Sequence, residues 1–96
     1  MFTHIVLFKL HDNAPENLDT TRAILLSMQG KIPQLRDIEV GVDALRTDRS
    51  FDLALVTRFD SPRDYRAYRT HPYHVDPVLK HMHAVAEAAV VVDYES

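Results

Sequence analysis

The sequence predicts an α+β domain built on one four-stranded antiparallel sheet with helices over a single face. Strand and helix patterns follow one another in the order strand, helix, strand, strand, helix, strand. The 96 residues are the length of one domain, which we expect to span 1–96. A hydrophobic share of 46% is ordinary for a globular protein, so we do not expect disorder.

The first strand is expected over residues 2–10, where both alternating sets of side chains are largely apolar. Such a strand is covered on both faces. A helix follows, with Asn13 as its cap, Pro15 in its first turn and Glu16 close to a capping-box position. Gly30 marks its end. Spacings of seven, three and four residues give this helix one buried stripe, formed by Leu18, Leu25, Met28 and Ile32.

Two strands come next in the chain. The second strand is expected over residues 35–45, where apolar side chains alternate with polar ones. Residues 46–50 are polar and typical of a turn. The third strand is expected over residues 51–59, with aromatic and aliphatic side chains on one of its two faces.

A second helix has a clear start at Ser61. The Ser61 hydroxyl caps it, Pro62 takes the first position and Asp64 the third. We expect this helix to run to about Thr70, because the residue before Pro72 is disfavoured in helical geometry. The second helix of the fold is therefore predicted to be broken here.

The pair Asp76-Pro77 repeats the signal for a helix start, and a final strand is expected over residues 88–94. One face of the last helix carries Val78, Met82 and Val85. The complete order is βαββαβ. With short connections and right-handed crossovers, this order gives the ferredoxin-like arrangement of a four-stranded antiparallel sheet.

The sheet face without helices is also apolar. Its expected members, taken from alternate strand positions, are Ile5, Leu7, Ala54, Val56, Ala89 and Val91. Monomers rarely expose an apolar patch of more than about a few hundred Å². We therefore expect a homodimer, in which a second copy packs sheet against sheet about a two-fold axis.

Charge and composition exclude several classes of partner. The net charge is −3, from 11 Lys and Arg against 14 Asp and Glu, with no basic stripe for nucleic acid. No apolar run approaches the roughly 20 residues of a membrane span. The start of the chain lacks the pattern of a signal peptide, so a cytoplasmic location is expected. Arg63, Arg66 and Arg69 are interpreted as a solvated helix face, with steering of an anionic substrate as the second interpretation.

The candidate site centres on a segment in which Tyr68 precedes His71 and His74. Proline breaks the helix here, so the segment presents its side chains from a sharp corner. His4 on the first strand is expected to face the helices and to converge on the same space. Histidine suits proton transfer near neutral pH, and a tyrosine hydroxyl can donate to a developing oxyanion. We therefore expect a pocket for a small organic molecule.

Structural roles compete with these assignments. Tyr68 could be a core aromatic, His71 a helix C-terminal cap and His4 a satisfied core histidine. His74 is the strongest functional candidate. His81 and His83 are expected to be solvated, and His11 lies in a loop and is assigned no role.

No metal or nucleotide cofactor is expected. The chain has only two glycines, so a glycine-rich phosphate loop is absent, and it has no cysteine. His71 and His74 could both reach one ion, but no carboxylate stands at a standard ligand spacing with them.

These segments together resemble the stress-responsive dimeric α/β-barrel (Dabb) domain family. The resemblance rests on His-Ile-Val-Leu-Phe-Lys-Leu in the first strand, Phe-Asp-Leu-Ala-Leu-Val-Thr-Arg-Phe-Asp-Ser-Pro in the third, Tyr-x-x-His-Pro-x-His, and the terminal Val-Val-Asp-Tyr. It covers essentially the whole chain. It implies a ferredoxin-like protomer and a dimer whose two sheets form a barrel.

Polyketide cyclases of the olivetolic acid type are similar to this family, and the similarity implies residue roles. It places a general base at His74, a pocket tyrosine at Tyr68 and a first-strand pocket histidine at His4, and His71 also matches. The first helix departs from that pattern, because it offers Leu18, Thr21, Arg22, Leu25 and Leu26 in place of aromatics. Two functions stay open: a cofactor-free acid/base enzyme acting on an enolisable substrate, and a non-catalytic module that binds a small ligand.

Overall fold

The computed structural model describes residues 1–96 and contains one antiparallel sheet with the strand order β2-β3-β1-β4. The elements are β1 (Phe2–Leu10), α1 (Pro15–Leu26), β2 (Asp37–Val42), β3 (Leu53–Phe59), α2 (Pro62–Thr70), η1 (His74–Leu79), α3 (Lys80–Val85) and β4 (Ala86–Glu95). The ferredoxin-like topology predicted from the sequence is confirmed.

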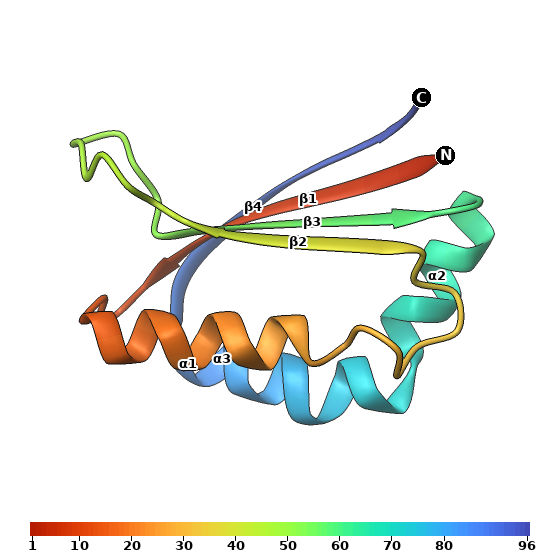
Figure 1. Ribbon diagram of the computed structural model, residues 1–96, viewed down its shortest axis with the longest axis horizontal. Helices are drawn as coiled ribbons and strands as arrows, with labels where there is room; N and C mark the ends of the chain where they lie inside the picture. The colour runs from red at the N-terminus through yellow and green to blue at the C-terminus, as the bar shows by residue number, and fades with distance from the viewer.

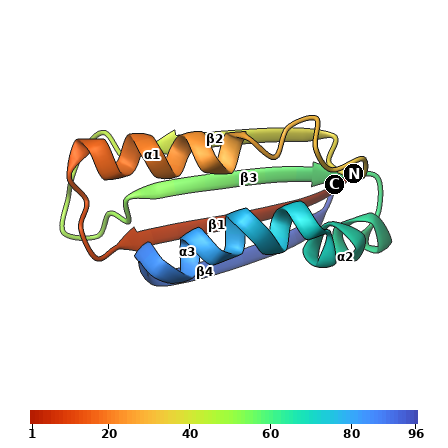
Figure 2. The same cartoon turned by 90° about the horizontal axis from the view of Figure 1, so that it is seen from below.

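All helices lie on one side of the sheet (Figure 1). Seen from that side, α1 runs along β2 and β3, while α3 runs along β1 and β4 (Figure 2). The helix α2 lies at one end of the molecule, near both chain termini. The opposite face of the sheet carries no helix. None of the helices has the length and hydropathy to cross a bilayer.

The core fills the space between the sheet and the helices. It is a single cluster of buried side chains: Val6, Phe8, Leu10, Leu18, Leu25, Met28, Ile32, Ile38, Val40, Leu53, Leu55, Phe59, Tyr68, Val78 and Met82. The whole predicted stripe of the first helix belongs to it. Burial of such side chains contributes about 1.5–3 kcal/mol each before the entropy of ordering is subtracted.

The first helix differs from its prediction at both ends. It ends at Leu26, and turns carry Met28 and Ile32 into the core. Its cap position is Ala14 rather than Asn13. The Asn13 side chain is used elsewhere, because its Nδ2 donates to Asp52 Oδ1 at 3.3 Å.

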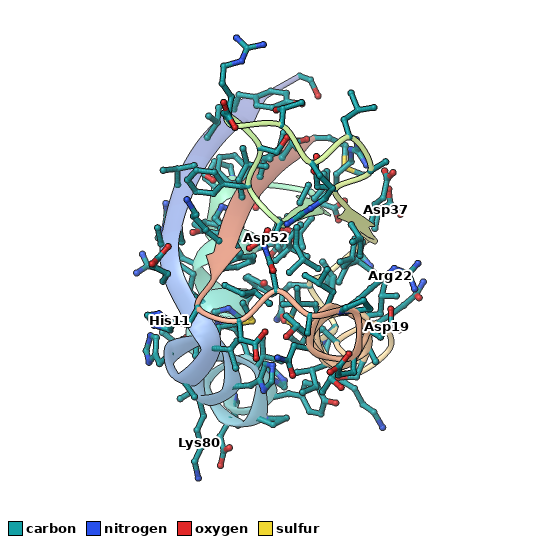
Figure 3. The ribbon with its side chains drawn as sticks, turned by 90° about the vertical axis from the view of Figure 1, so that its left-hand side faces the viewer. His11, Asp19, Arg22, Asp37, Asp52 and Lys80 are labelled. Carbon is teal, nitrogen blue, oxygen red and sulfur yellow. The ribbon has the colours of Figure 1, made fainter.

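The buried carboxylate of Asp52 connects the end of β1 to the loop before β3. It is 3% exposed and accepts hydrogen bonds from Leu10 N at 2.7 Å and Arg46 Nη2 at 3.0 Å, besides that from Asn13. Figure 3 shows Asp52 between the β2–β3 loop and the chain that leads into α1. Burial alone would raise the pKa of Asp52, but these hydrogen bonds outweigh it and hold the pKa below its ordinary value.

The predicted start of the second helix is confirmed. Ser61 Oγ accepts a hydrogen bond from Asp64 N at 3.2 Å, and Pro62 is the first helical residue. The helix ends at Thr70, and His71 has extended geometry (φ −62°, ψ 136°). A second interruption falls at Asp76 (φ −143°, ψ 112°), where the sequence predicted a new helix start.

The open sheet face is apolar, but the prediction for β4 was wrong by one residue. Ile5 pairs with Val92 and Leu7 with Val90, so Val90 and Val92 share the open face. Ala89 and Val91 pair with helix-facing residues of β1 instead. The pairing register fixes this parity, and a periodicity of two within one strand does not reveal it.

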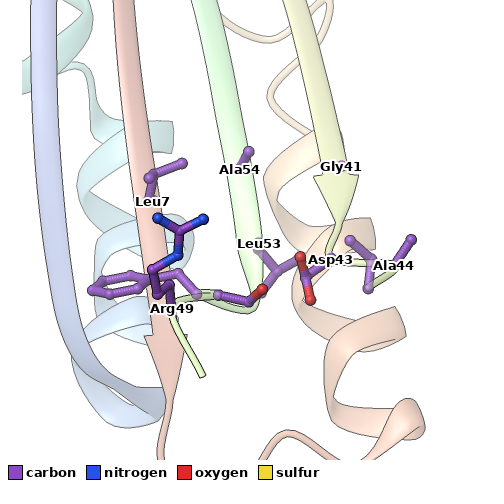
Figure 4. A pocket seen from close by; sticks show the side chains of 10 residues that line it. Leu7, Gly41, Asp43, Ala44, Arg49, Leu53 and Ala54 are labelled. Carbon is purple, nitrogen blue, oxygen red and sulfur yellow. The ribbon is translucent and has the colours of Figure 1, made fainter. Parts of the chain in front are cut away.

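Large side chains stay exposed on this face: Leu7 (38%), Val90 (49%) and Val92 (62%). Under the β2–β3 loop the face is hollowed by a cavity of about 480 Å³ that Leu7, Ala54 and Arg49 help to line (Figure 4). The sheet thus presents a broad unpartnered apolar surface.

Candidate functional site

A second cavity, of about 260 Å³, lies between the sheet and the helical layer. Its apolar wall consists of Val6, Phe8, Leu25, Leu55, Val78, Leu79 and Met82. Its polar wall consists of His4, Tyr65, Tyr68, Arg69 and His74. Three of the four residues predicted for the site, His4, Tyr68 and His74, therefore come together here.

His74 lies just after the helix break and has a defined tautomer. Its Nδ1 lies 2.9 Å from the backbone carbonyl oxygen of Arg69. A carbonyl oxygen can only accept, so Nδ1 carries the proton and donates it, and Nε2 keeps its lone pair. Burial lowers the pKa of His74, and the nearby charges of His4, Arg69 and His71 lower it further, although the Arg69 carbonyl acts in the opposite direction. His74 is therefore neutral, and a base, at neutral pH.

Tyr68 packs directly against this imidazole. Its ring centroid is 4.3 Å from that of His74, and the residue is 1% exposed. Burial raises the pKa of Tyr68, so the phenol stays protonated. Its hydroxyl has no hydrogen-bond partner within the chain. Gln34 Oε1 is the one fully buried side-chain polar atom without a partner, so the Tyr68 hydroxyl oxygen is not fully buried. The Tyr68 hydroxyl is thus open to the cavity and able to donate.

His4 enters the cavity from the sheet and is paired with Asp93 on β4. The His4 Nδ1 contacts the Asp93 carboxylate, and the two residues face each other in the β1–β4 register. Because the carboxylate accepts, Nδ1 is the protonated nitrogen and Nε2 is the free one. The residue is 7% exposed, so the pair fixes the orientation of a nearly buried ring.

Sequence reasoning missed both Asp93 and Tyr65. The signal for Asp93 was a single acid that follows three valines in an apolar strand. Its parity could have been assigned only with the correct register of β4. Tyr65 packs over His4 with ring centroids 4.7 Å apart, and it contacts Tyr68 at 6.1 Å. It forms the aromatic side of the cavity mouth.

His71 does not line the cavity. It occupies the C-terminal cap of α2, and its Nδ1 accepts a hydrogen bond from Tyr73 N at 3.1 Å. This is close to the capping role that was its alternative interpretation. His74 and His71 thus have opposite tautomers, because one Nδ1 donates and the other accepts.

The prediction for His81 was wrong. Its Nε2 lies 2.9 Å from the Thr21 hydroxyl, and it joins α3 to α1 from a half-buried position. The contact depends on how α1 packs beside α3, which the apolar face of the last helix does not reveal. His83 is exposed, as expected, and so is His11.

The first helix contributes little to the cavity. Of its five candidate wall residues only Leu25 lines it. Leu18 is in the core, Thr21 binds His81, and Arg22 Nε donates to the Val40 carbonyl at 3.2 Å.

The donor set does not fit a metal ion. No three or more histidine, aspartate or glutamate side chains gather in a metal-binding arrangement. Nδ1 of His71 and Nδ1 of His74 both have backbone partners. What the arrangement can do is move protons, with a neutral imidazole, a protonated phenol and an aspartate-bound imidazole around one small cavity.

One family profile and several solved structures match this chain. The profile of the Stress responsive A/B Barrel Domain family (Dabb) matches residues 2–96. Among solved structures, a dimeric ferredoxin-like protein of unknown function from Bacteroides fragilis is 33% identical, with a TM-score of 0.84 over 99% of this chain and 95% of its own. Among curated proteins, none matches this chain.

Two further structures share the fold. A dimeric ferredoxin-like protein of unknown function from Thermobifida fusca is 26% identical, with a TM-score of 0.86 over 99% of this chain and 90% of its own. A hydroxynitrile lyase from Passiflora edulis is 20% identical, with a TM-score of 0.83 over 97% and 90%. These comparisons do not establish a closer relation to polyketide cyclases.

Proposed function

The chain belongs to the stress-responsive A/B barrel domain family, and on that premise we propose that it is a cofactor-free acid/base enzyme acting on a small enolisable molecule. One observation carries the proposal. A histidine with a free Nε2 and a lowered pKa stands against a protonated, buried tyrosine in a largely apolar cavity. Perturbed groups of this kind, gathered in a cleft, are characteristic of active sites.

In the proposed reaction, His74 removes a proton from the carbon next to a substrate carbonyl. Nε2 takes the proton, while Nδ1–H continues to donate its hydrogen bond to the Arg69 carbonyl, which stabilises the imidazolium that forms. The apolar wall excludes water, which strengthens each electrostatic interaction within the cavity.

Tyr68 is assigned the stabilisation of the oxyanion. Its hydroxyl donates to the oxygen of the enolate as negative charge develops there, and its raised pKa keeps the proton available. The His74 imidazolium returns the proton from its Nε2, while His4, whose ring is oriented by Asp93, offers its free Nε2 as a hydrogen-bond acceptor for the substrate. His71 has no assigned step.

We also propose that the working form is a homodimer joined through the open sheet face. The exposed apolar residues of that face support this, and so does the dimeric nature of the similar structures. The cavity of about 260 Å³ lies just below the roughly 300–1,000 Å³ of pockets for drug-sized ligands. The proposed substrate is therefore small, with one ring or a short chain.

The test is proton exchange with solvent. Phenylpyruvate and phenylacetone both carry acidic protons next to a carbonyl. Incubation with the protein in D₂O, followed by proton NMR, reports their exchange. We expect protein-dependent exchange of at least one probe, and His74→Gln should lower it about 10²- to 10⁴-fold.

The matched control is His71→Asn, which removes an imidazole three residues away and keeps an acceptor for Tyr73 N. Exchange should survive this change. Equal exchange rates for the wild type and His74→Gln would contradict the proposal. A protein that binds the probes in the cavity without exchanging their protons would instead be the non-catalytic binding module.

A further inference from the structure

The arginines of α2 have no carboxylate partner. Three arginines on other elements are paired with carboxylates: Arg36 with Asp60, Arg46 with Asp43 and Asp52, and Arg58 with Asp37. Arg22 and Arg49 are unpaired as well, but neither lines the cavity between the sheet and the helices. Arg63, Arg66 and Arg69 lie within 4.0 Å of no carboxylate oxygen, and all three are exposed. Of these three, only Arg69 lines the cavity between the sheet and the helices.

The position of Arg69 relative to the base is fixed by the backbone. Its carbonyl oxygen accepts the hydrogen bond from His74 Nδ1. The same residue therefore orients the imidazole and carries the guanidinium. Arg69 lines the cavity together with His74 and Tyr65. The nearby carboxylate, Asp93, is already bound to His4.

We propose that Arg69 binds the carboxylate of the substrate, which makes the substrate class a small carboxylic acid with an apolar body. This inference rests on the proposed function and names the substrate of the same site. A guanidinium binds a carboxylate with two parallel hydrogen bonds, a geometry that neutral ligands cannot match. The remaining wall is largely aliphatic and aromatic, so it accepts the body of such an acid but offers no other cation to its charge.

The arrangement also determines which carbon reacts. A carboxylate held by Arg69 lies at the rim, and the apolar body extends inward past Tyr68 and His74. The carbons close to the carboxylate then lie nearest to the base. An acid with a carbonyl group close to its carboxylate would present its acidic protons there.

The experiment compares phenylacetate with phenylacetamide, which have similar shapes and differ in charge. Binding is followed by NMR shifts of methyl groups in the cavity wall, such as those of Val78 and Leu25, so that surface binding is not counted. We expect the wild type to bind phenylacetate more tightly than the amide. Arg69→Gln should weaken phenylacetate binding by about 10- to 100-fold, the size of a lost charged hydrogen bond, and leave amide binding unchanged.

Arg66→Gln is the matched control. It removes the same charge from the same helix but does not alter the cavity wall. Phenylacetate binding should survive it. Equal loss of phenylacetate binding in Arg66→Gln and Arg69→Gln would show that only the overall positive charge of α2 matters, and would overturn the proposal. Equal affinity for acid and amide would overturn it as well, and so would a wild type that binds neither at millimolar concentration.

The binding result is separable from the proposed chemistry. Neither probe has to react, so a failure of the anion site appears in the binding titration and a failure of the base appears in deuterium exchange. The two claims can therefore fail independently.

Discussion

A single backbone carbonyl determines which nitrogen of His74 is basic. The Arg69 oxygen accepts the hydrogen bond from Nδ1–H. The helix break between α2 and η1 makes this contact possible, because Arg69 and His74 are five residues apart. The same break leaves His71 facing its own backbone, with the opposite tautomer. Two histidines three residues apart thus have different chemistry.

The titration of His74 gives the first prediction. Its pKa is lowered in the folded protein, so the unfolded chain binds its proton more readily, and stability attributable to this group is lost as the pH falls below about 6.5. Two-dimensional NMR should show His74 titrating below that value, with the proton on Nδ1. His74→Gln should make the free energy of unfolding less dependent on pH in this range, and an unchanged dependence would contradict the assignment.

The second prediction concerns Tyr68. Tyr68→Phe keeps the ring that packs against Phe59 and His74 and removes only the hydroxyl. We expect deuterium exchange to fall about 10²- to 10³-fold, as for a lost oxyanion donor, while binding of phenylacetate is retained. Measuring both on the same sample separates the roles. A variant with full exchange activity would leave Tyr68 with a packing role alone.

Residues of the site could be predicted where the local sequence constrains them. The helix break and the β1 pattern placed His4, Tyr68 and His74 together without any tertiary information. Asp93 is 89 residues from His4 in the sequence, and predicting that the two pair requires the register between β1 and β4. That register is a tertiary property. Arg69 was interpreted first as part of a solvated helix face, and steering of an anionic substrate was only the second interpretation, because its spacing from the neighbouring arginines is typical of such a face.

At the scale of elements, boundaries set by caps were predictable and boundaries set by competing contacts were not. Ser61 caps α2 as expected, because its partner is local. Asn13 does not cap α1, because its side chain donates a hydrogen bond to the buried Asp52 carboxylate, which is 39 residues away in the sequence. The carboxylate thereby determines how β1 is connected to the first helix.

Asp52 gives the third prediction. Asp52→Asn keeps the shape but loses the charge that Leu10 N and Arg46 bind, so the free energy of unfolding should fall by about 1–3 kcal/mol in urea denaturation. The wild-type pKa is lowered, so its contribution is present above about pH 3.9 and is lost below that value. Asp60→Asn, in an exposed ion pair with Arg36, is the control and should change stability by less than about 1 kcal/mol. Equal effects of the two substitutions would contradict the role of Asp52.

The whole molecule has two different sheet faces. One is covered by helices and contains the cavity, while the other exposes aliphatic side chains from β1, β3 and β4. Joining two such faces removes from water the surface that a single copy leaves exposed. The cavity lies on the far side of the sheet from this surface, so dimer formation and proton transfer can be tested separately.

The fourth prediction follows from this surface. Leu7→Glu places a charge in the middle of the open face, and a buried unpaired charge costs several kcal/mol, so the dimer should dissociate. Val75→Glu, an exposed apolar position in the helical layer, is the control and should leave the dimer intact. Sedimentation equilibrium distinguishes the outcomes. A wild-type mass of one 11.0 kDa chain would contradict the dimer.

The pH dependence of deuterium exchange tests the central claim, that His74 Nε2 is the base, most directly. The rate with wild-type protein should rise through a single ionisation below about pH 6.5 and level off by neutral pH, because the base must be unprotonated and burial lowers its pKa. His71→Asn should keep this profile and His74→Gln should abolish it. An ionisation that persists in His74→Gln, or a wild-type rate that does not change with pH, would contradict the account.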